Sequence, residues 1–181
     1  DEHEDAVIES AVAAFKRVRE KMAWRSGDEV RVVLHSFKDF GDKHADALKH
    51  AVLKVAGDDL KVQFAFVHIA ENHPVLLFDS SEKQQIPPRG SVVRMGRSEA
   101  LVAVLGPSEV RNDRLGFPRP VCVKVHRSST YTDLDYLSWQ ALAFSAQSWR
   151  NFTPTSVPIT VLYAELIAGL LARLGSLSKW D

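Results

Sequence analysis

The segment VRVVLHS, residues 30–36, decides the class of fold. It is short and rich in β-branched residues, a composition that predicts a buried strand. Helical periodicity flanks it on both sides: apolar side chains recur every three or four residues over 5–22 and again over 43–56, where Asp42 is the expected cap. A strand between two helices indicates an α/β fold.

The rest of the chain predicts more strands, followed by two helices. Thr132 and Asp135 resemble a capping box at the start of a helix over 133–149. Pro158 suits the first turn of a last helix, and Gly175 its end. This order predicts a mixed sheet flanked by helices and incomplete on its N-terminal side, so that upstream sequence or a partner chain would complete it. The further predicted strands are 61–69, 75–79, 91–95, 100–105 and 120–126.

Length and composition describe one globular domain over residues 1–181. The chain is 45% hydrophobic and 25% charged, which suffices for a core. No apolar run approaches the roughly 18 residues that span a bilayer, so no membrane partner is expected. The single cysteine, Cys122, lies in the apolar run VCVKV and is expected to be a packed thiol in the cytoplasm, a reducing compartment. Because the chain starts at Asp1 without a methionine, we expect a longer parent protein.

Basic residues are concentrated in one region, although the formal net charge of the chain is zero. Residues 83–127 contain nine lysines or arginines and three acidic residues, whereas the first ten residues contain five acids. Basic charge between strands is the pattern that phosphate binding requires. An ordinary basic surface has the same pattern, so both interpretations stay open.

Several familiar catalytic and metal-binding patterns are absent. His35 and Ser36 are adjacent, but neighbouring residues of a strand point to opposite faces, and no G-x-S-x-G motif surrounds the serine. His68, Glu71 and His73 follow no recognised metal-ligand spacing, so we expect surface histidines there. The glycine-rich phosphate-binding motifs G-x-x-x-x-G-K-[ST] and G-x-G-x-x-G are both absent from the sequence.

The loop between the two last predicted helices is rich in hydrogen-bond donors. It contains Arg150, Thr153, Thr155 and Ser156, with no acidic residue among them. The free N–H groups at the start of the next helix attract anions, and an arginine with hydroxyl groups would complete a cradle for phosphate. A helix–helix turn with ordinary caps would use similar residues. The sequence therefore predicts either a phosphate cradle or a capped turn.

Four segments resemble a known family. The segment WRNFTPTSVPITVLYAELIAGL (149–170) resembles the C-terminal end of the Piwi domain of prokaryotic Argonaute proteins. PPRGSVV (87–93), GFPRP (116–120) and RVVLHSF (31–37) resemble further elements of that domain in the same order. The resemblance implies that residues 1–181 are the C-terminal portion of a Piwi domain with an RNase H-like fold. It also implies a guide RNA or DNA and a complementary target as partners.

The resemblance assigns roles to individual residues. Arg150 matches the arginine near the 5′ phosphate of the guide, and Arg119 matches the arginine that lies along the guide seed. Ser156 and Tyr163 fall at positions that contact the guide backbone. The remaining expected guide-binding residues are Thr153, Thr155 and Lys124. If Asp181 is the native end of the chain, its carboxylate is expected to help hold a Mg²⁺ ion at the guide 5′ phosphate.

The catalytic positions of the family are degenerate in this chain. Slicing Argonautes bind two Mg²⁺ ions through acidic or histidine side chains, but here Phe37, or Ser36 in the neighbouring register, takes the place of an aspartate. Glu165 stands at the fourth catalytic position, where the family prefers aspartate or histidine. We therefore expect guide-directed binding without cleavage. Two alternatives stay open: a guide-dependent nuclease completed by upstream acids and Asp39, and a protein-interaction domain that has lost the nucleic acid.

Overall fold

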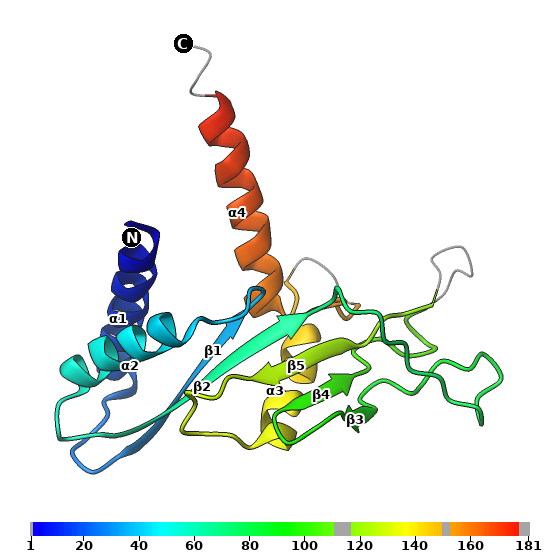
Figure 1. Ribbon diagram of the computed structural model, residues 1–181, viewed down its shortest axis with the longest axis horizontal. Helices are drawn as coiled ribbons and strands as arrows, with labels where there is room; N and C mark the ends of the chain where they lie inside the picture. The colour runs from blue at the N-terminus through cyan, green and yellow to red at the C-terminus, as the bar shows by residue number, and fades with distance from the viewer. Residues whose placement is uncertain (1, 111–116, 150–152, 178–181) are drawn as a thin grey trace. The chain divides into compact units, whose positions relative to one another are not determined.

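The computed structural model describes residues 2–110, 117–149 and 153–177. Figure 1 labels the helices and strands of the described chain. The elements are α1 (Glu2–Met22), β1 (Glu29–Ser36), α2 (Asp42–Ala56), β2 (Lys61–Ala70), β3 (Val92–Arg94), β4 (Glu99–Val102), β5 (Val121–Val125), α3 (Leu134–Ser145) and α4 (Ile159–Leu177).

The five strands form one sheet in the order β1-β2-β5-β4-β3. β1 and β2 are joined through α2, and their arrows in Figure 1 point the same way, as a helical crossover requires. β4 is antiparallel to both of its neighbours, with Val102 opposite Val92 on β3 and Glu99 opposite Lys124 on β5. The mixed α/β sheet flanked by helices is therefore confirmed, and β1 lies at the edge of the described sheet.

Two compact units divide the chain, and the first contains the N-terminal helices. It comprises the residues up to Leu34 together with Asp39–Phe66 and Val125–Thr132. α1 packs against α2, and apolar side chains from both helices and from β1 and β2 fill the core. The fully buried members of this core include Leu48, Val52, Phe64 and Phe66.

The second unit contains the candidate site. It comprises His35–Lys38, Val67–Lys124 and the residues from Asp133 onward. α3 packs against β4, and α4 packs against α3. Residues 100–102 of β4 and the apolar residues of β5 are buried, and both strands lie inside the sheet with a neighbour on each edge. The predicted packing of Cys122 is confirmed, since its side chain is buried and burial raises the pKa of the thiol to about 12.

The structure corrects two of the predicted helix starts. The N-cap of α2 is Gly41, and Asp42 is already helical, where its carboxylate pairs with Arg127. The predicted capping box of Thr132 and Asp135 is also wrong. Asp133 caps α3 by accepting a hydrogen bond from the backbone N–H of Tyr136 (3.0 Å), and Asp135 instead forms an ion pair with Arg94.

The predicted strand 75–79 and two predicted helix ends are also wrong. Residues 75–79 form no strand, and Phe78 within them is 61% exposed. α3 ends at Ser145, not at residue 149, because the carbonyl of Ser145 accepts hydrogen bonds from the N–H and the hydroxyl of Thr155. Gly175 lies within α4 and does not end it. Among the described helices, none combines the length and the apolarity that a bilayer-spanning segment needs.

Candidate functional site

A hollow of about 200 Å³ lies in the second unit, where three segments meet. Phe37 directly follows β1, and Glu165 comes from the second turn of α4. The third segment is the end of β2 with the residues after it. The structure thus brings the two degenerate catalytic positions, Phe37 and Glu165, to one hollow. The other lining residues are His68, Ile69, Ala70, Glu71, Asn72, Val157 and Val161.

The location of this hollow follows from the topology of the sheet. β1 and β2 are neighbours, and the ends of neighbouring parallel strands meet at the same edge of a sheet, where ligand sites of α/β proteins are usual. Sequence reasoning treated His68 and Glu71 as surface residues and did not single out Asn72. His68, Glu71 and Asn72 lie at or just after the end of the predicted strand 61–69. That position could have placed them at the edge of the sheet where the hollow lies.

The donor groups around the hollow do not suit a divalent cation. In the described part of the chain, no three His, Cys, Asp or Glu side chains gather in a way that could hold a metal ion. Phe37 offers no ligand atom, and the polar side chains that line the hollow are His68, Glu71, Asn72 and Glu165. His73 is not part of this lining, and its Nε2 atom is hydrogen-bonded to the carbonyl of Pro120 (2.7 Å). Ser36 is also occupied, because its hydroxyl bonds to the carbonyl of Lys38 (2.7 Å). His68 and His73 are half-buried and not the surface histidines that the sequence predicts, and the expectation that they bind no metal stays a prediction.

His35 joins β1 to the first turn of α4. Its Nδ1 atom lies 2.8 Å from the hydroxyl oxygen of Thr160, and its ring meets the ring of Phe144 edge to face. Burial lowers the pKa of His35 to about 4, so the imidazole is neutral at physiological pH. This neutral histidine holds the start of α4 beside the end of β1, which Phe37 follows.

The loop before α4 divides its hydroxyl groups between two environments. The hydroxyl of Thr155 donates to the carbonyls of Ser145 (3.0 Å) and Val157 (2.5 Å), so a phosphate would have to compete with these internal bonds. Thr153 and Ser156 are exposed. The hydroxyl of Tyr163 lies 3.5 Å from the hydroxyl of Ser148. The structure therefore places Thr153 and Ser156 where an external anion could reach them.

Two of the expected anion-binding groups lie outside the described residues, namely Arg150 and Asp181. Their roles stay predictions.

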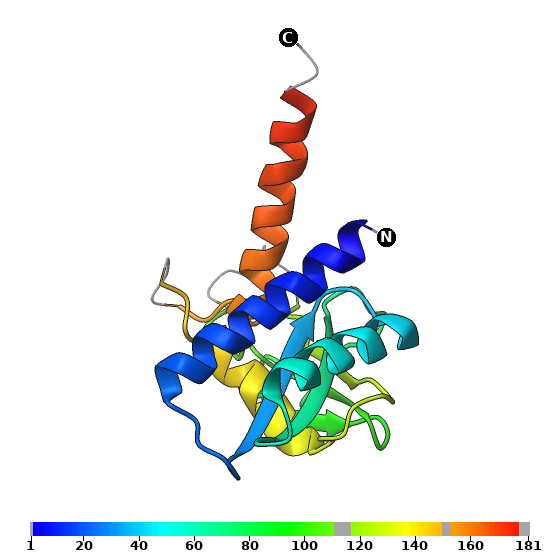
Figure 2. The same cartoon turned by 90° about the vertical axis from the view of Figure 1, so that its left-hand side faces the viewer.

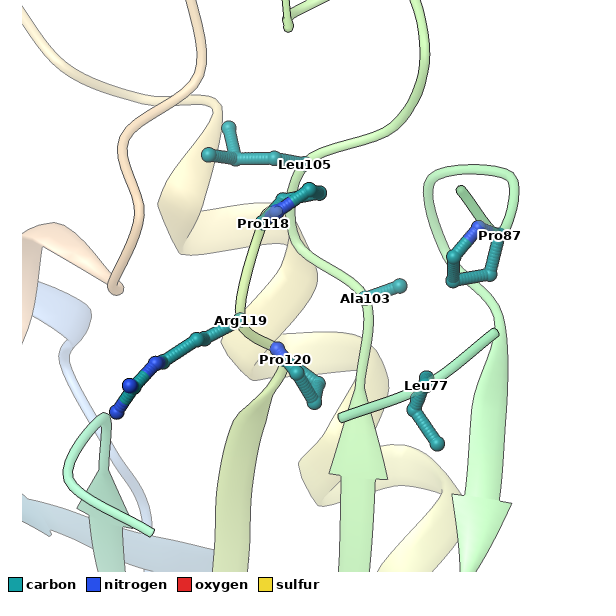
Figure 3. A pocket seen from close by; sticks show the side chains of 7 residues that line it. All are labelled: Leu77, Pro87, Ala103, Leu105, Pro118, Arg119 and Pro120. Atoms are coloured by element: carbon teal, nitrogen blue, oxygen red, sulfur yellow. The ribbon is translucent and has the colours of Figure 1, made fainter. Parts of the chain in front are cut away.

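Arg119 points away from the apolar side chains around it. Leu77, Pro87, Pro118 and Pro120 lie close together, and the space between them is too small for a water molecule. Figure 3 shows the guanidinium of Arg119 extending to the opposite side. The side chain is exposed, and no described carboxylate lies within ion-pair distance of it. Lys124 is also exposed, on β5.

The basic region 83–127 contains fewer available cations than its sequence indicates. Arg94 is paired with Asp135, and Arg127 is paired with Asp42. The guanidinium of Arg89 is used inside the protein, where it donates to the carbonyls of Val104 (3.1 Å) and Leu142 (3.2 Å). Arg111 and Arg114 lie outside the described residues.

Comparison with known proteins identifies the family. No family model matches the chain. The argonaute protein of Cereibacter sphaeroides is 35% identical over 192 residues, an alignment that covers 99% of this chain and 25% of that protein. The chain belongs to the argonaute family. The Piwi protein of Archaeoglobus fulgidus is 25% identical over 139 residues, which cover 68% of this argonaute chain and 32% of that protein.

Solved argonaute structures share the fold of this argonaute chain. A crystal structure of A. aeolicus Argonaute superposes with a TM-score of 0.64 at 17% identity, covering 91% of this chain and 21% of that one. A structure of Clostridium butyricum Argonaute bound to a guide DNA and a 19-mer target DNA gives a TM-score of 0.60 at 20% identity. That match covers 78% of this chain and 17% of the Clostridium butyricum chain. The RNase H-like fold expected from the Piwi resemblance is thus confirmed. The argonaute chain spans a quarter to a third of the length of its curated relatives.

Proposed function

We propose that this argonaute chain belongs to a protein that holds a short guide strand and uses base pairing to recognise a complementary target without cutting it. The observation that carries this proposal is the 35% identity to an argonaute over 99% of the chain. The Clostridium butyricum argonaute, which shares the fold, was solved with a guide and a target DNA. Base pairing would supply the sequence recognition, while the protein would contact the backbone.

The absence of cleavage is proposed from the donor set of the hollow. In-line cleavage by two metal ions needs several carboxylate or imidazole ligands close together. At this hollow Phe37 stands where the family has a carboxylate, and the lining contains Glu71, Glu165 and the imidazole of His68. Among the described residues, no three such side chains gather to hold a metal ion. These groups do not fit a pair of Mg²⁺ ions, so we derive no cleavage step through them.

Guide binding is proposed at the start of α4. Thr153 and Ser156 are exposed hydroxyl residues directly before this helix, whose first N–H groups have no partner within the helix. Arg119 would add a cation from the segment before β5. Arg150, and a Mg²⁺ ion held with the carboxylate of Asp181, are proposed to complete the 5′-phosphate site.

A guide-dependent nuclease is the second candidate. The observation that favours it is that Glu165 and Glu71 border the same hollow as Phe37. Acids from elsewhere in a longer argonaute, together with Asp39, would have to supply the missing ligands. A protein-interaction domain without nucleic acid is a third class, which the exposed Arg119 and Ser156 make less favourable.

Binding of labelled guides to the full-length natural protein tests the proposed guide site. We expect a 5′-phosphorylated strand to bind about tenfold or more tightly than the same strand with a 5′ hydroxyl, because a charge-assisted contact contributes roughly 1.5–3 kcal/mol. Arg150→Ala should reduce this preference, and Arg150→Lys should restore part of it, because lysine has the charge without the planar fork. Equal affinity of the natural protein for both strands would refute the phosphate site.

A further inference from the structure

Phe78 and Phe117 form an aromatic pair on the surface of the second unit. Their ring centroids lie 4.6 Å apart, with an angle of 39° between the ring planes, and Phe78 is 61% exposed. We propose that this pair is a stacking platform for a nucleobase of the bound guide or target strand. The inference rests on the proposed function and adds a contact with a base to the phosphate contacts of that function.

The exposure of Phe78 follows from the packing of its segment. Burial alternates over residues 73–80, with Leu76 and Phe78 exposed and Leu77 between them half-buried. Leu77 lines the small apolar space that it shares with Pro118, as Figure 3 shows. Phe78 therefore contributes little to the core of the unit, and most of its ring is available to a ligand.

The backbone around both rings is restricted. Directly after Phe78, the N–H of Asp79 donates to the carbonyl of Gln85 (3.0 Å), and the carboxylate of Asp79 accepts bonds from the N–H (3.0 Å) and the hydroxyl (2.6 Å) of Ser81. The residue after Phe117 is a proline, which favours an extended backbone at Phe117. The platform is thus largely formed before a ligand binds, and this lowers the entropy cost of binding.

The charge beside the platform favours nucleic acid. Arg119 follows Phe117 by two residues, roughly 7 Å along an extended chain, and its exposed guanidinium has no described carboxylate within ion-pair distance. The carboxylate of Asp79, the acid next to Phe78, is already bonded to Ser81. Surfaces that bind single strands combine cations along the backbone with aromatic rings on which bases stack. Arg119 would hold a phosphate while the ring of Phe78 holds a base.

A second exposed aromatic pair lacks such a cation and provides a comparison. Tyr136 and Trp139 lie on α3 with ring centroids 6.1 Å apart, and Trp139 is 60% exposed. α3 packs against β4, as Figures 1 and 2 show. Arg94 is paired with Asp135, the residue before Tyr136. Exposed rings alone do not favour a nucleic-acid strand, so we expect no base at Trp139.

Filter binding of labelled strands to the full-length natural protein tests the platform. Phe78→Ala should weaken binding of the strand that carries the stacked base about 5- to 100-fold, the range expected for the loss of one base stack. Phe78→Tyr should bind as the natural protein does, whereas Phe78→Leu, which has no aromatic face, should bind as weakly as Phe78→Ala. Trp139→Ala is the matched control and should bind normally. The slope of log affinity against log salt should stay unchanged in Phe78→Ala, because no phosphate contact is lost.

Abasic sites identify the strand and the position of the stacked base. One arm measures binding of a 5′-phosphorylated guide, and the other measures binding of a complementary target to the protein that already holds its guide. In each arm an abasic site replaces one nucleotide at a time. At one position in one strand, we expect the loss caused by the abasic site to be smaller in Phe78→Ala, by the factor that Phe78→Ala itself costs with the intact strand.

Several results would overturn the platform. If Phe78→Ala and the natural protein bind equally in both arms, the platform is wrong and the proposed guide binding stands. Normal binding by Phe78→Leu would show an apolar contact, such as one with a protein partner, instead of a base stack. Equal losses in Phe78→Ala and Trp139→Ala, or the absence of a coupled abasic position, would also contradict it. If the natural protein retains neither strand, the proposed function fails, and the platform fails with it.

Discussion

Single cations in the basic region differ in whether a neighbouring carboxylate already neutralises them. Arg94 and Asp135 pair on the surface, and a hydrogen bond from Arg94 lowers the pKa of that carboxyl. Arg119 is exposed, with no described carboxylate in ion-pair distance. Equal changes of charge at these two positions should therefore have different effects on nucleic-acid binding.

We predict that Arg119→Ala weakens binding of unrelated guide sequences to a similar degree. The change should also reduce the slope of log affinity against log salt by about one for each lost phosphate contact. Arg94→Ala is the matched control and should leave that slope unchanged. Filter binding at several salt concentrations measures both, and an unchanged slope for Arg119→Ala would place this side chain off the path of the nucleic acid.

The buried imidazole of His35 should make stability depend on pH. Burial lowers its pKa in the folded protein to about 4, below the value of 6.5 in an unfolded chain. Above pH 6.5 the ring is neutral in both states and has no effect. As the pH falls below 6.5 the unfolded chain binds a proton that the folded protein does not, so the folded state loses stability.

From these two pKa values, His35 should reduce the free energy of unfolding by about 2 kcal/mol between pH 8 and pH 5. His35→Gln removes the titrating group, so the variant should lose correspondingly less stability over this range. Urea unfolding of both proteins at the two pH values gives the difference, in which the other histidines cancel. The same pH dependence in both proteins would contradict the buried, neutral assignment.

Helices α1 and α2 differ in the residue that adopts a positive φ where the helix ends. α1 ends with Ala23 in a left-handed conformation (φ 50°), and the N–H of Trp24 bonds back to the carbonyl of Arg19 (3.4 Å). α2 ends with Gly57, also at positive φ (68°). An alanine in this conformation is strained, whereas glycine is not.

Ala23→Gly should therefore stabilise the protein by about 1 kcal/mol. Gly57→Ala is the reverse change and should destabilise it, although a Cβ there would meet no atom within 4 Å, so the effect isolates the backbone conformation. Thermal unfolding of the two variants shows whether each change raises or lowers the stability of the protein. Destabilisation by Ala23→Gly would show that the left-handed turn is not strained.

Arg89 connects the PPRG segment to β4 and α3. Its guanidinium donates to the carbonyl of Val104 and, on α3, to the carbonyl of Leu142 and the hydroxyl of Ser145. Arg89→Lys keeps the charge but cannot make all three contacts. It should cost about 2–3 kcal/mol in the free energy of unfolding. Arg97→Lys, at an exposed turn, is the control and should change the free energy of unfolding little. Equal stability of the two variants would show that the three hydrogen bonds of Arg89 do not stabilise the fold.

The order of elements could be predicted from the sequence because periodicity and β-branched runs are local properties. The strand expected at 75–79 was wrong because pairing depends on a neighbour, and this apolar segment has none in the described sheet. The end of α3 depends on Thr155, ten residues away in the sequence, which takes the carbonyl of Ser145. No pattern within the helix contains that information.

The candidate site was predicted less completely than the fold. Family resemblance indicated Phe37 and Glu165, and both line the same hollow. The sequence did not indicate that Arg89, counted as one cation of the basic region, is a structural residue. It also did not indicate that His35 fixes α4 through Thr160. Such roles depend on contacts between distant segments, which spacing along the chain does not show.

In the whole molecule, the proposed guide site and the hollow differ in the chemistry of their side chains. Among the described residues, no three His, Cys, Asp or Glu side chains gather at the hollow or elsewhere to hold a metal ion, while the start of α4 presents hydroxyl and N–H donors suited to an anion. A protein built in this way would hold a guide and pair it with a target without cutting either.

Incubation of the full-length natural protein with a guide and an end-labelled complementary target, with Mg²⁺ or Mn²⁺, tests this account most directly. One sample gives two readouts: target retained on a filter, and target length on a denaturing gel. The account predicts that the matched guide greatly increases retention, that a mismatched guide does not, and that the target stays at full length. Retention that is independent of the guide sequence, or a product cut opposite the middle of the guide and lost in Glu165→Ala, would contradict it.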